Sequence, residues 1–298
     1  MCTQLITLVK RRGFTYRLDK ERKTVWILKG HIKRGRRYRI PSRVEIEGVE
    51  YIVESVEAGA YKVPSTLRHL VIPDEIQYVD EYNFSTCKGL RSVYIGKGLE
   101  HLSSWIFHMN PRMNVFEIAK ENPYLCIKNG IVYSKDMNVV VCCIFNLRKI
   151  EIPEGVKSIM ASAFWWNPKL EEVSFPSSLR VIGDNSLSGC QRLKRLVIPE
   201  GFEEFVVQSL QHNESLEYVD LPSTMKELGY ETFFDCPNIK TFIIRTEFVL
   251  EAESSSAGDF DFVPHCTLYV PENLVPLYRT HPLWCRCASI RSIESMNG

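Results

Sequence analysis

A repeated frame of 23 residues constrains the fold of this chain more than any other feature of its sequence. In residues 193–213, LKRLVIPEGFEEFVVQSLQHN, a leucine-x-x-apolar-x-apolar motif is formed by Leu193, Leu196 and Ile198, and Pro199 follows it. The motif recurs with starts at Leu67, Leu90, Met113, Leu147, Leu170, Leu193, Leu216 and Ile239. Six of the seven steps between starts are 23 residues long, and the other is 34. A period kept over so many copies indicates a repeat architecture, in which stacked units share one core.

Each unit is expected to contribute one strand and two buried apolar side chains. The fourth and sixth residues of the motif alternate with polar neighbours, as in a half-buried strand. Proline follows the last apolar residue in five of the eight copies and ends the strand, because proline donates no ladder hydrogen bond. Position twelve is occupied by Val79, Leu102, Ile159, Ile182, Phe205 and Leu228. Position seventeen is occupied by Phe84, Phe107, Phe164, Leu187, Leu210 and Phe233.

Position twenty carries only asparagine or cysteine. The residues there are Cys87, Asn110, Asn167, Cys190, Asn213 and Cys236. Both types are small and can donate a hydrogen bond, and the backbone groups of a buried turn need such partners. We therefore predict a structural ladder of these side chains inside the stack.

An asparagine or cysteine twenty residues after such a strand motif resembles the leucine-rich repeat. The Ile-Pro after the strand and the later pair Ala163-Phe164 resemble its 23-residue BspA-like group, and the resemblance covers residues 38–298. It implies an α+β repeat protein: a leucine-rich repeat solenoid with one parallel strand per repeat. The family is bacterial and is associated with adhesion and with binding of host proteins or other partners. The resemblance thus implies a non-enzymatic scaffold that binds a protein ligand.

The chain divides into caps and repeats in this interpretation. Residues 1–60 form a β-rich N-terminal cap with a degenerate first repeat, residues 61–250 hold the repeats, and residues 251–298 form a strand–helix–strand C-terminal cap. The long step contains an insertion at about residues 122–144, where Asn129-Gly130 predicts a β-hairpin with a type I′ turn.

The N-terminal cap should contain a hairpin of residues 14–18 and 25–28. In the C-terminal cap, we expect a strand over 266–270, a helix from Pro271 to about Thr280, and a last strand near 290–293.

No motif for catalysis or for binding a cofactor is present, so we expect neither an enzyme nor a cofactor. One concentration of possible zinc ligands lies in the C-terminal cap: His265, Cys266, His281, Cys285 and Cys287. Their spacings match no standard zinc module. We interpret them as a small core of the cap and expect no metal.

Positive charge is concentrated near the N-terminus. Residues 10–43 hold 14 Lys or Arg against Asp19 and Glu21, a net charge of +12, whereas the rest of the chain has a net charge of −11. This block supports an alternative function, the binding of an anionic polymer such as nucleic acid or an acidic glycan. The block lacks a recognised nucleic-acid fold, so we do not expect nucleic acid as a partner. We favour the explanation that the hairpin strands place these charges in solvent, where they also discourage edge pairing.

The outward side chains of the strands are the predicted ligand surface, on the concave face of the solenoid. They flank the inward apolar residue of each strand, and neighbouring strands lie about 4.8 Å apart. Tyrosine and arginine are enriched at interface hot spots, and acidic residues set electrostatic selectivity. The candidate residues are Tyr94, Glu117, Lys149, Glu151, Glu172, Arg195, Tyr218 and Asp220. Trp165-Trp166 is a second candidate, either as an exposed patch or packed against the insertion.

Compartment and oligomeric state are weakly constrained. No stretch approaches the roughly 18 apolar residues of a membrane span. The N-terminal stretch MCTQLITLVKRRGF carries its charges after its short apolar run, unlike a signal peptide. We therefore expect a cytoplasmic protein if the sequence is complete, and a bacterial cell-surface or secreted protein if a signal was removed. Cys87, Cys190 and Cys236 are too widely spaced along the stack for disulfides, so we expect reduced thiols. We also expect a monomer.

Overall fold

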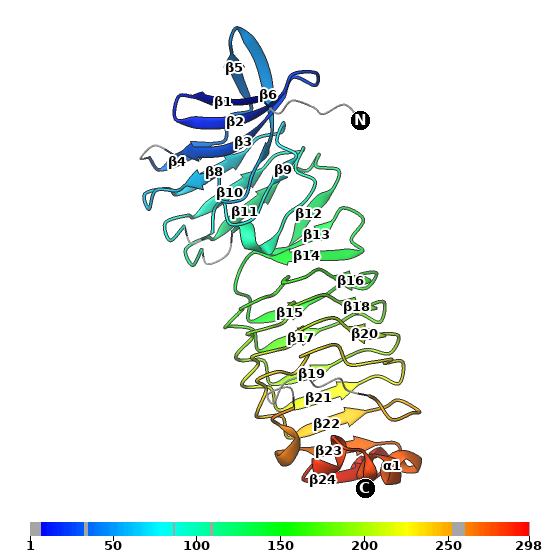
Figure 1. Ribbon diagram of the computed structural model, residues 1–298. Helices are drawn as coiled ribbons and strands as arrows, with labels where there is room; N and C mark the ends of the chain where they lie inside the picture. The colour runs from blue at the N-terminus through cyan, green and yellow to red at the C-terminus, as the bar shows by residue number, and fades with distance from the viewer. Residues whose placement is uncertain (1–6, 33–34, 86, 108–109, 252–259, 298) are drawn as a thin grey trace. The chain divides into compact units, whose positions relative to one another are not determined.

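The computed structural model describes residues 7–32, 35–85, 87–107, 110–251 and 260–297 (Figure 1). It contains two compact units: residues 1–136 with 141–145, and residues 137–140 with 146–298. The bounds of these two units differ from the bounds predicted for the caps and the repeats. The predicted bounds therefore remain predictions. Each unit contains stacked repeats with parallel strands, as the sequence predicts.

The first unit begins with a seven-stranded sheet. Its strands are β1 (Thr7–Arg11), β2 (Phe14–Asp19), β3 (Thr24–His31), β5 (Arg43–Ile46), β6 (Val49–Val56), β7 (Tyr61–Lys62) and β9 (Tyr78–Val79). β2 and β3 pair antiparallel and are the predicted hairpin, and β1 adds to the other edge of β2. β6 pairs parallel with both β3 and β9, so the cap sheet continues into the repeats.

A four-stranded parallel sheet follows, with one strand per repeat. It contains β4 (Arg37–Arg39), β8 (His69–Ile72), β10 (Ser92–Ile95) and β11 (Val115–Ile118). The pairs His69–Ser92 and Ser92–Val115 show a register of one repeat per strand. The 3₁₀ turn η1 (Ser104–Ile106) lies between β10 and β11, and Ser103 caps it.

The inserted hairpin is confirmed. β12 (Leu125–Lys128) and β13 (Ile131–Ser134) pair antiparallel around Asn129 and Gly130. The φ angles of these two residues are 53° and 80°, the left-handed values that a type I′ turn requires.

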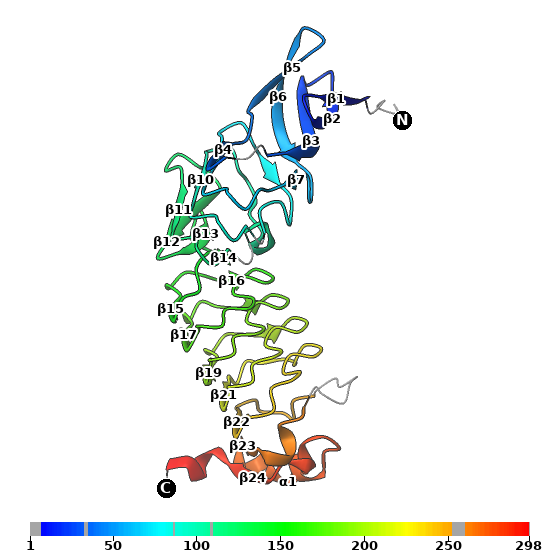
Figure 2. The ribbon, with the colours of Figure 1, turned by 90° about the vertical axis from the view of Figure 1, so that its left-hand side faces the viewer.

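The second unit has two columns of strands (Figures 1 and 2). The first column contains β15 (Lys149–Glu151), β17 (Glu172–Ser174), β19 (Arg195–Val197), β21 (Tyr218–Leu221), β22 (Thr241–Ile244), β23 (Thr267–Val270) and β24 (Ser289–Ser292). β15 and β17 form one parallel sheet, and β19, β21, β22, β23 and β24 form another. Figure 2 shows these strands stacked along one side of the unit.

The second column was not predicted from the sequence. It contains β16 (Ser158–Ile159), β18 (Val181–Ile182) and β20 (Glu204–Phe205), which pair in parallel with one another, and β16 also pairs with residues 139 and 140 of β14 (Val139–Cys143). The new strands hold position twelve and the residue before it. Strands of two residues are too short to show an alternating pattern, which is why the sequence indicated only a buried position there.

The core of the second unit lies between its two columns. Phe205 at position twelve is 2% exposed, and Phe164, Leu187 and Leu210 at position seventeen are at most 1% exposed. Apolar packing between neighbouring repeats therefore holds the stack together, as the frame predicts.

The C-terminal cap closes this core with short helical turns. These are η2 (Val263–His265), η3 (Glu272–Leu274), α1 (Val275–Thr280), η4 (Trp284–Arg286) and η5 (Ile293–Asn297). Trp284 is fully buried, and its indole N–H donates to the Leu250 carbonyl at 3.0 Å. The hydroxyl of Tyr278 accepts from the Leu250 amide at 2.9 Å, so both side chains connect the cap to the last repeat.

Candidate functional site

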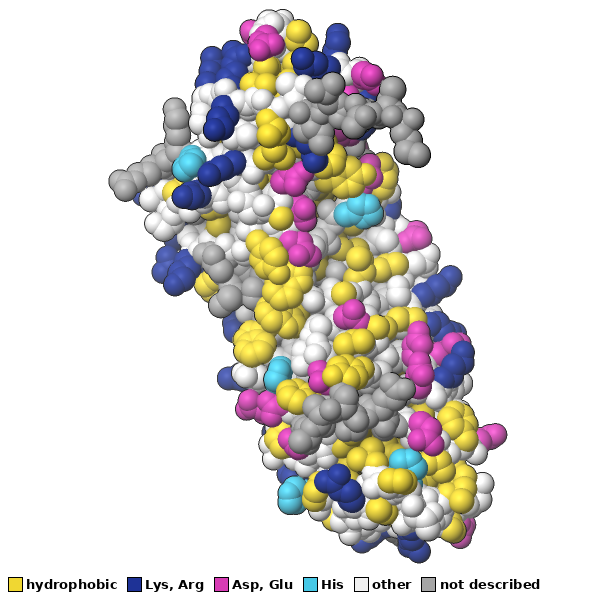
Figure 3. Space-filling view, viewed as in Figure 1, with side chains coloured by type: hydrophobic (Ala, Val, Ile, Leu, Met, Phe, Trp, Pro, Cys, Tyr) yellow, Lys and Arg dark blue, Asp and Glu magenta, His cyan; other side chains and the backbone are white. Residues whose placement is uncertain are grey.

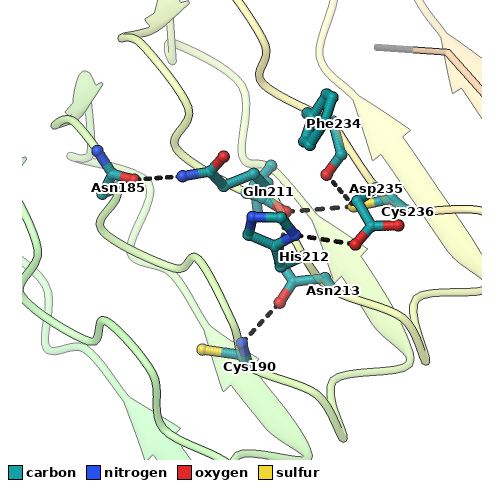
Figure 4. Close-up of polar contacts among 9 residues, drawn as sticks. Asn185, Cys190, Gln211, His212, Asn213, Phe234, Asp235 and Cys236 are labelled. Carbon is teal, nitrogen blue, oxygen red and sulfur yellow. Dashed lines mark hydrogen bonds and ion pairs between the residues drawn. The ribbon is translucent and has the colours of Figure 1, made fainter. Parts of the chain in front are cut away.

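The position-twenty residues bind backbone groups inside the stack (Figure 4). Asn213 is fully buried, and its amide donates to the carbonyls of Leu187 at 3.0 Å and Leu210 at 2.7 Å. Its side-chain oxygen accepts from the backbone N–H of Cys190 at 2.7 Å. One side chain thus satisfies three backbone groups from two neighbouring repeats.

Two further members of position twenty make similar bonds. Asn110 donates to two carbonyls, those of Phe84 and Phe107. The thiol of Cys236 donates to the Leu210 carbonyl at 3.2 Å. Cysteine therefore serves the same carbonyl column as asparagine, although a thiol is the weaker donor.

A second ladder at position sixteen escaped the sequence analysis. The hydroxyl of Ser186 donates to the carbonyls of Met160 and Gly183, and the hydroxyl of Ser209 donates to the carbonyl of Val206 at 2.6 Å. The recurrence of small polar residues at this position was the available signal. Asn213, Ser186 and Ser209 are fully buried, so these ladders stabilise the scaffold from inside the stack.

Two predicted surface residues lie in the first unit. Tyr94 on β10 and Glu117 on β11 are partners in the parallel register, and both side chains are exposed. The other six predicted residues lie in the second unit, where they form two clusters.

The first cluster of the second unit is an exposed charge group. The ammonium of Lys149 lies 3.1 Å from a carboxylate oxygen of Glu151 and 3.5 Å from one of Glu172. The hydrogen bond with Glu151 raises the pKa of Lys149. Because water screens exposed pairs, this cluster adds little to stability and remains available to exchange partners.

The second cluster is an arginine stacked on a tyrosine. Arg195 on β19 and Tyr218 on β21 are register partners, and the guanidinium carbon lies 3.7 Å from the centre of the Tyr218 ring. The Tyr218 hydroxyl donates to Asp220 at 3.3 Å. Burial and the Asp220 carboxylate raise the pKa of Tyr218, so the hydroxyl keeps its proton at neutral pH.

The prediction that Asp220 is exposed is wrong. Asp220 is only 7% exposed, because Arg245 covers it through two hydrogen bonds, from Nε to Oδ1 at 2.7 Å and from Nη2 to Oδ2 at 2.9 Å. Sequence reasoning missed Arg245. The signal was its place in the last repeat, directly after Ile244, where five other copies have the strand-ending proline.

The side chains of the two neighbouring tryptophans, Trp165 and Trp166, contact each other. The ring centres of Trp165 and Trp166 are 5.7 Å apart, and Trp166 is 42% exposed. Gly189, one repeat further on, leaves room for the indole of Trp166, since a Cβ at Gly189 would lie 2.4 Å from that ring. Trp166 therefore packs partly on the next repeat.

The C-terminal cysteines and histidines differ in exposure and in their contacts. Cys266 is fully buried, whereas Cys285 is exposed. The ring of His281 accepts from the backbone N–H of Leu283 at 3.2 Å. Within the described ranges, no three His, Cys, Asp or Glu side chains are placed to hold a metal ion. Among the same residues, no helix has the length and apolar character to cross a bilayer.

Comparisons with known proteins agree on the fold. The profile of the BspA type leucine-rich repeat region matches in six copies, at residues 53–130 and 138–253. No curated protein matches the sequence.

Similar solved structures are bacterial. A leucine-rich repeat protein of Bacteroides ovatus is 17% identical, with 96% of this chain and 77% of that chain covered and a TM-score of 0.56. The pneumococcal vaccine antigen PcpA is 14% identical, with 97% and 99% covered and a TM-score of 0.58. A leucine-rich repeat protein of Eubacterium ventriosum is 14% identical, with 87% and 82% covered and a TM-score of 0.52. At such identities the similarity concerns the fold.

Proposed function

The chain belongs to the BspA type leucine-rich repeat family, and from this premise we propose that it is a non-enzymatic scaffold that binds a protein ligand. The binding surface is the strand face of the second unit, by which we mean the outward side chains of β15, β17, β19 and β21. Those side chains are Lys149, Glu151, Glu172, Ser174, Arg195, Val197 and Tyr218.

The observation that carries the proposal is the stack of Arg195 on Tyr218. Arginine and tyrosine are the types most often found at interface hot spots. Here they are arranged before any ligand arrives, because Tyr218 is bonded to Asp220 and Asp220 is held by Arg245. Side chains that are already ordered lose less conformational entropy on binding, which favours affinity.

The surroundings of the stack suit a protein better than a polymer of one charge. Val197 lies beside Arg195 on β19 and is 43% exposed, which offers apolar area next to the stack. The Lys149 cluster contributes both signs of charge at the next strands. An apolar and aromatic centre with a mixed charged rim is the usual anatomy of a protein interface.

The test compares two double variants of the full chain. Arg195→Glu with Tyr218→Ala alters the strand face, whereas Lys226→Glu with Tyr230→Ala makes a matched change at exposed side chains outside the strand face. A protein captured from cell-surface or cytosolic extracts with wild-type bait is purified, and its Kd is measured for each variant. We expect the strand-face variant to lose at least about tenfold in affinity, equivalent to about 1.4 kcal/mol, and the control to keep wild-type affinity.

Two results would contradict the proposal. One is an unchanged Kd for the strand-face variant. The other is binding that falls steeply with salt and is abolished by neutralising the exposed Arg36 and Arg37, since that pattern belongs to an anionic polymer on the N-terminal cap.

A further inference from the structure

The cap sheet contains a basic pocket of about 350 Å³ at the end where β1 and β2 meet. Its lining includes Lys10, Arg12, Thr15, Lys29 and His31. All of it belongs to the first unit. Figure 3 shows lysine and arginine side chains gathered over this end of the chain. A pocket of this size lies at the small end of the range for organic ligands.

The strand register places two lysines on the same face of the sheet. Lys10 on β1 is paired with Thr15 on β2, and Thr15 is paired with Lys29 on β3. Residues directly opposite in antiparallel strands project to the same side. The three side chains therefore form one row across three strands, with a hydroxyl between two ammonium groups.

A β-bulge in β3 brings Lys29 opposite Thr15 and so completes this row. The register between β2 and β3 shifts between Thr15 and Tyr16, so that Leu28 is the extra residue on β3. Bulges redirect the side chains that follow them. Here Lys29 and His31 follow it, and because they are two residues apart on a strand they face the same side.

The strands beneath the row are held firmly. Phe14 lies against Gly30, where an added Cβ would come within 2.3 Å of the ring. The ring of Phe14 also meets the buried Tyr61 edge-on, with 6.3 Å between the ring centres. The row of Lys10, Thr15 and Lys29 is therefore carried on a packed sheet and not on a loop.

The pocket has a positive lining. Among the residues that the structure describes, no carboxylate lines it. Arginines elsewhere in the same cap are paired: Arg17 with Glu57 at 2.7 Å, and Arg22 with Glu54 at 2.8 Å. No ion pair among the residues that the structure describes involves the side chains that face this pocket. Arg11 donates to the Glu45 carbonyl and is partly occupied there.

We propose that this pocket binds the phosphate or sulfate ester group of a sugar-sized molecule. A tetrahedral oxyanion accepts several charge-assisted hydrogen bonds at once, and ammonium, guanidinium and hydroxyl donors converge here to make them. A single-stranded nucleic acid is disfavoured, because such ligands need a basic groove with a series of exposed stacking aromatics. The inference is independent of the strand face, since it concerns the other unit.

The experiment measures binding of defined probes to the full chain by isothermal titration calorimetry. The probes are glucose 6-phosphate, glucose 6-sulfate, glucose, a heparin-derived hexasaccharide and a ten-nucleotide single-stranded DNA. We expect an ester to bind and glucose not to bind. Tighter binding of a monosaccharide ester than of the hexasaccharide indicates a free ester as the natural source, and the reverse order indicates a sulfated glycan.

Two variants and one control test the residues. Lys10→Gln with Lys29→Gln should weaken ester binding at least about tenfold, because it removes both charges of the row. Lys20→Gln with Lys23→Gln makes the same change in net charge at exposed lysines of the β2–β3 turn, outside the pocket, and should change affinity less than about twofold.

The variant Arg12→Gly distinguishes an effect on ester binding from an effect on stability. Arg12 has a φ of 48°, a left-handed conformation that glycine adopts without strain, so the variant should keep or raise the melting temperature. Its ester affinity should still fall, by roughly threefold to tenfold. The proposal is overturned if no ester binds at millimolar concentration, if the two lysine pairs lower affinity equally, or if the DNA binds and the sugar esters do not.

Discussion

Arg245 forms a two-point ion pair with Asp220 across neighbouring repeats of the second unit. Nε lies 2.7 Å from Oδ1 and Nη2 lies 2.9 Å from Oδ2. The Asp220 side chain is 10% exposed and that of Arg245 is 39% exposed. The pair therefore lets a carboxylate sit under the strand face, where it can hold the hydroxyl of Tyr218.

Replacing Arg245 should destabilise the second unit. Arg245→Met keeps most of the side-chain volume but leaves the Asp220 carboxylate without its charged partner. We expect a loss of about 1.5–3 kcal/mol in the free energy of unfolding, measured in urea, since hydrogen bonds to charged groups are worth about this much. Asp220→Asn in the Arg245→Met background should recover part of the loss, because it removes the stranded charge.

The exposed pair of Arg148 and Glu171 is the control for this experiment. Its contact distance is 2.7 Å, the same as that of the buried pair, but the Arg148 side chain is 79% exposed. Arg148→Met should leave the urea midpoint unchanged. If Arg245→Met and Arg148→Met lowered the free energy of unfolding equally, the burial of Asp220 would add nothing to the stabilising effect of its ion pair.

The stability lost when a ladder residue is replaced should depend on how many hydrogen bonds its side chain makes. Asn213→Ala leaves two carbonyls and one backbone N–H in a buried turn without their partner. We expect a loss of about 3 kcal/mol, within the range for orphaned buried groups. Asn213→Cys should be milder, because Cys236 supplies the same kind of donation one repeat later. Thermal unfolding of both variants checks the order, which a larger loss for the cysteine variant would contradict.

The buried ladder thiols should resist alkylation in the native protein. Burial raises the pKa of Cys87 and of Cys236 to about 12, so the reactive thiolate is scarce at pH 8. Cys285 is exposed and should be labelled. Iodoacetamide treatment followed by mass spectrometry of peptides reports each site, and labelling of Cys87 or Cys236 in urea is the positive control. Native labelling of Cys236 as fast as Cys285 would show that this part of the stack opens readily.

The sequence predicted the structure correctly at positions whose environment is local or is the same in every repeat. The turn at Asn129 needs only its own two residues, and Phe164 is buried because every unit buries that position. Both properties are local or periodic, so the frame contains them.

The features it missed depend on departures from the period. Asp220 is buried by Arg245, which stands where other copies have proline, so the rule of outward exposure fails there. The row of Lys10, Thr15 and Lys29 needs the register of three strands and a bulge, and neither can be deduced from spacing alone.

The contact of Trp166 with Gly189 offers a test of packing between repeats. Gly189 has a φ of 70°, and a Cβ there would lie 2.4 Å from the indole. Gly189→Ala should therefore cost about 2–4 kcal/mol, part from the left-handed backbone and part from displacing the ring. Gly155 is the matched control, since its φ is 97° and an added Cβ meets nothing within 4 Å. Gly155→Ala should cost only the backbone part, about 1–2 kcal/mol.

A double-mutant cycle then isolates the indole. In a Trp166→Ala background the ring is gone, so Gly189→Ala should cost no more than Gly155→Ala does. The coupling energy between positions 166 and 189 should be about 1–2 kcal/mol, within the range for residues in direct contact. Urea unfolding of the four proteins of the cycle gives this number. A coupling near zero would mean that the indole leaves Gly189 without loss and that Trp166 belongs to the exposed surface, not to the packing of one repeat on the next.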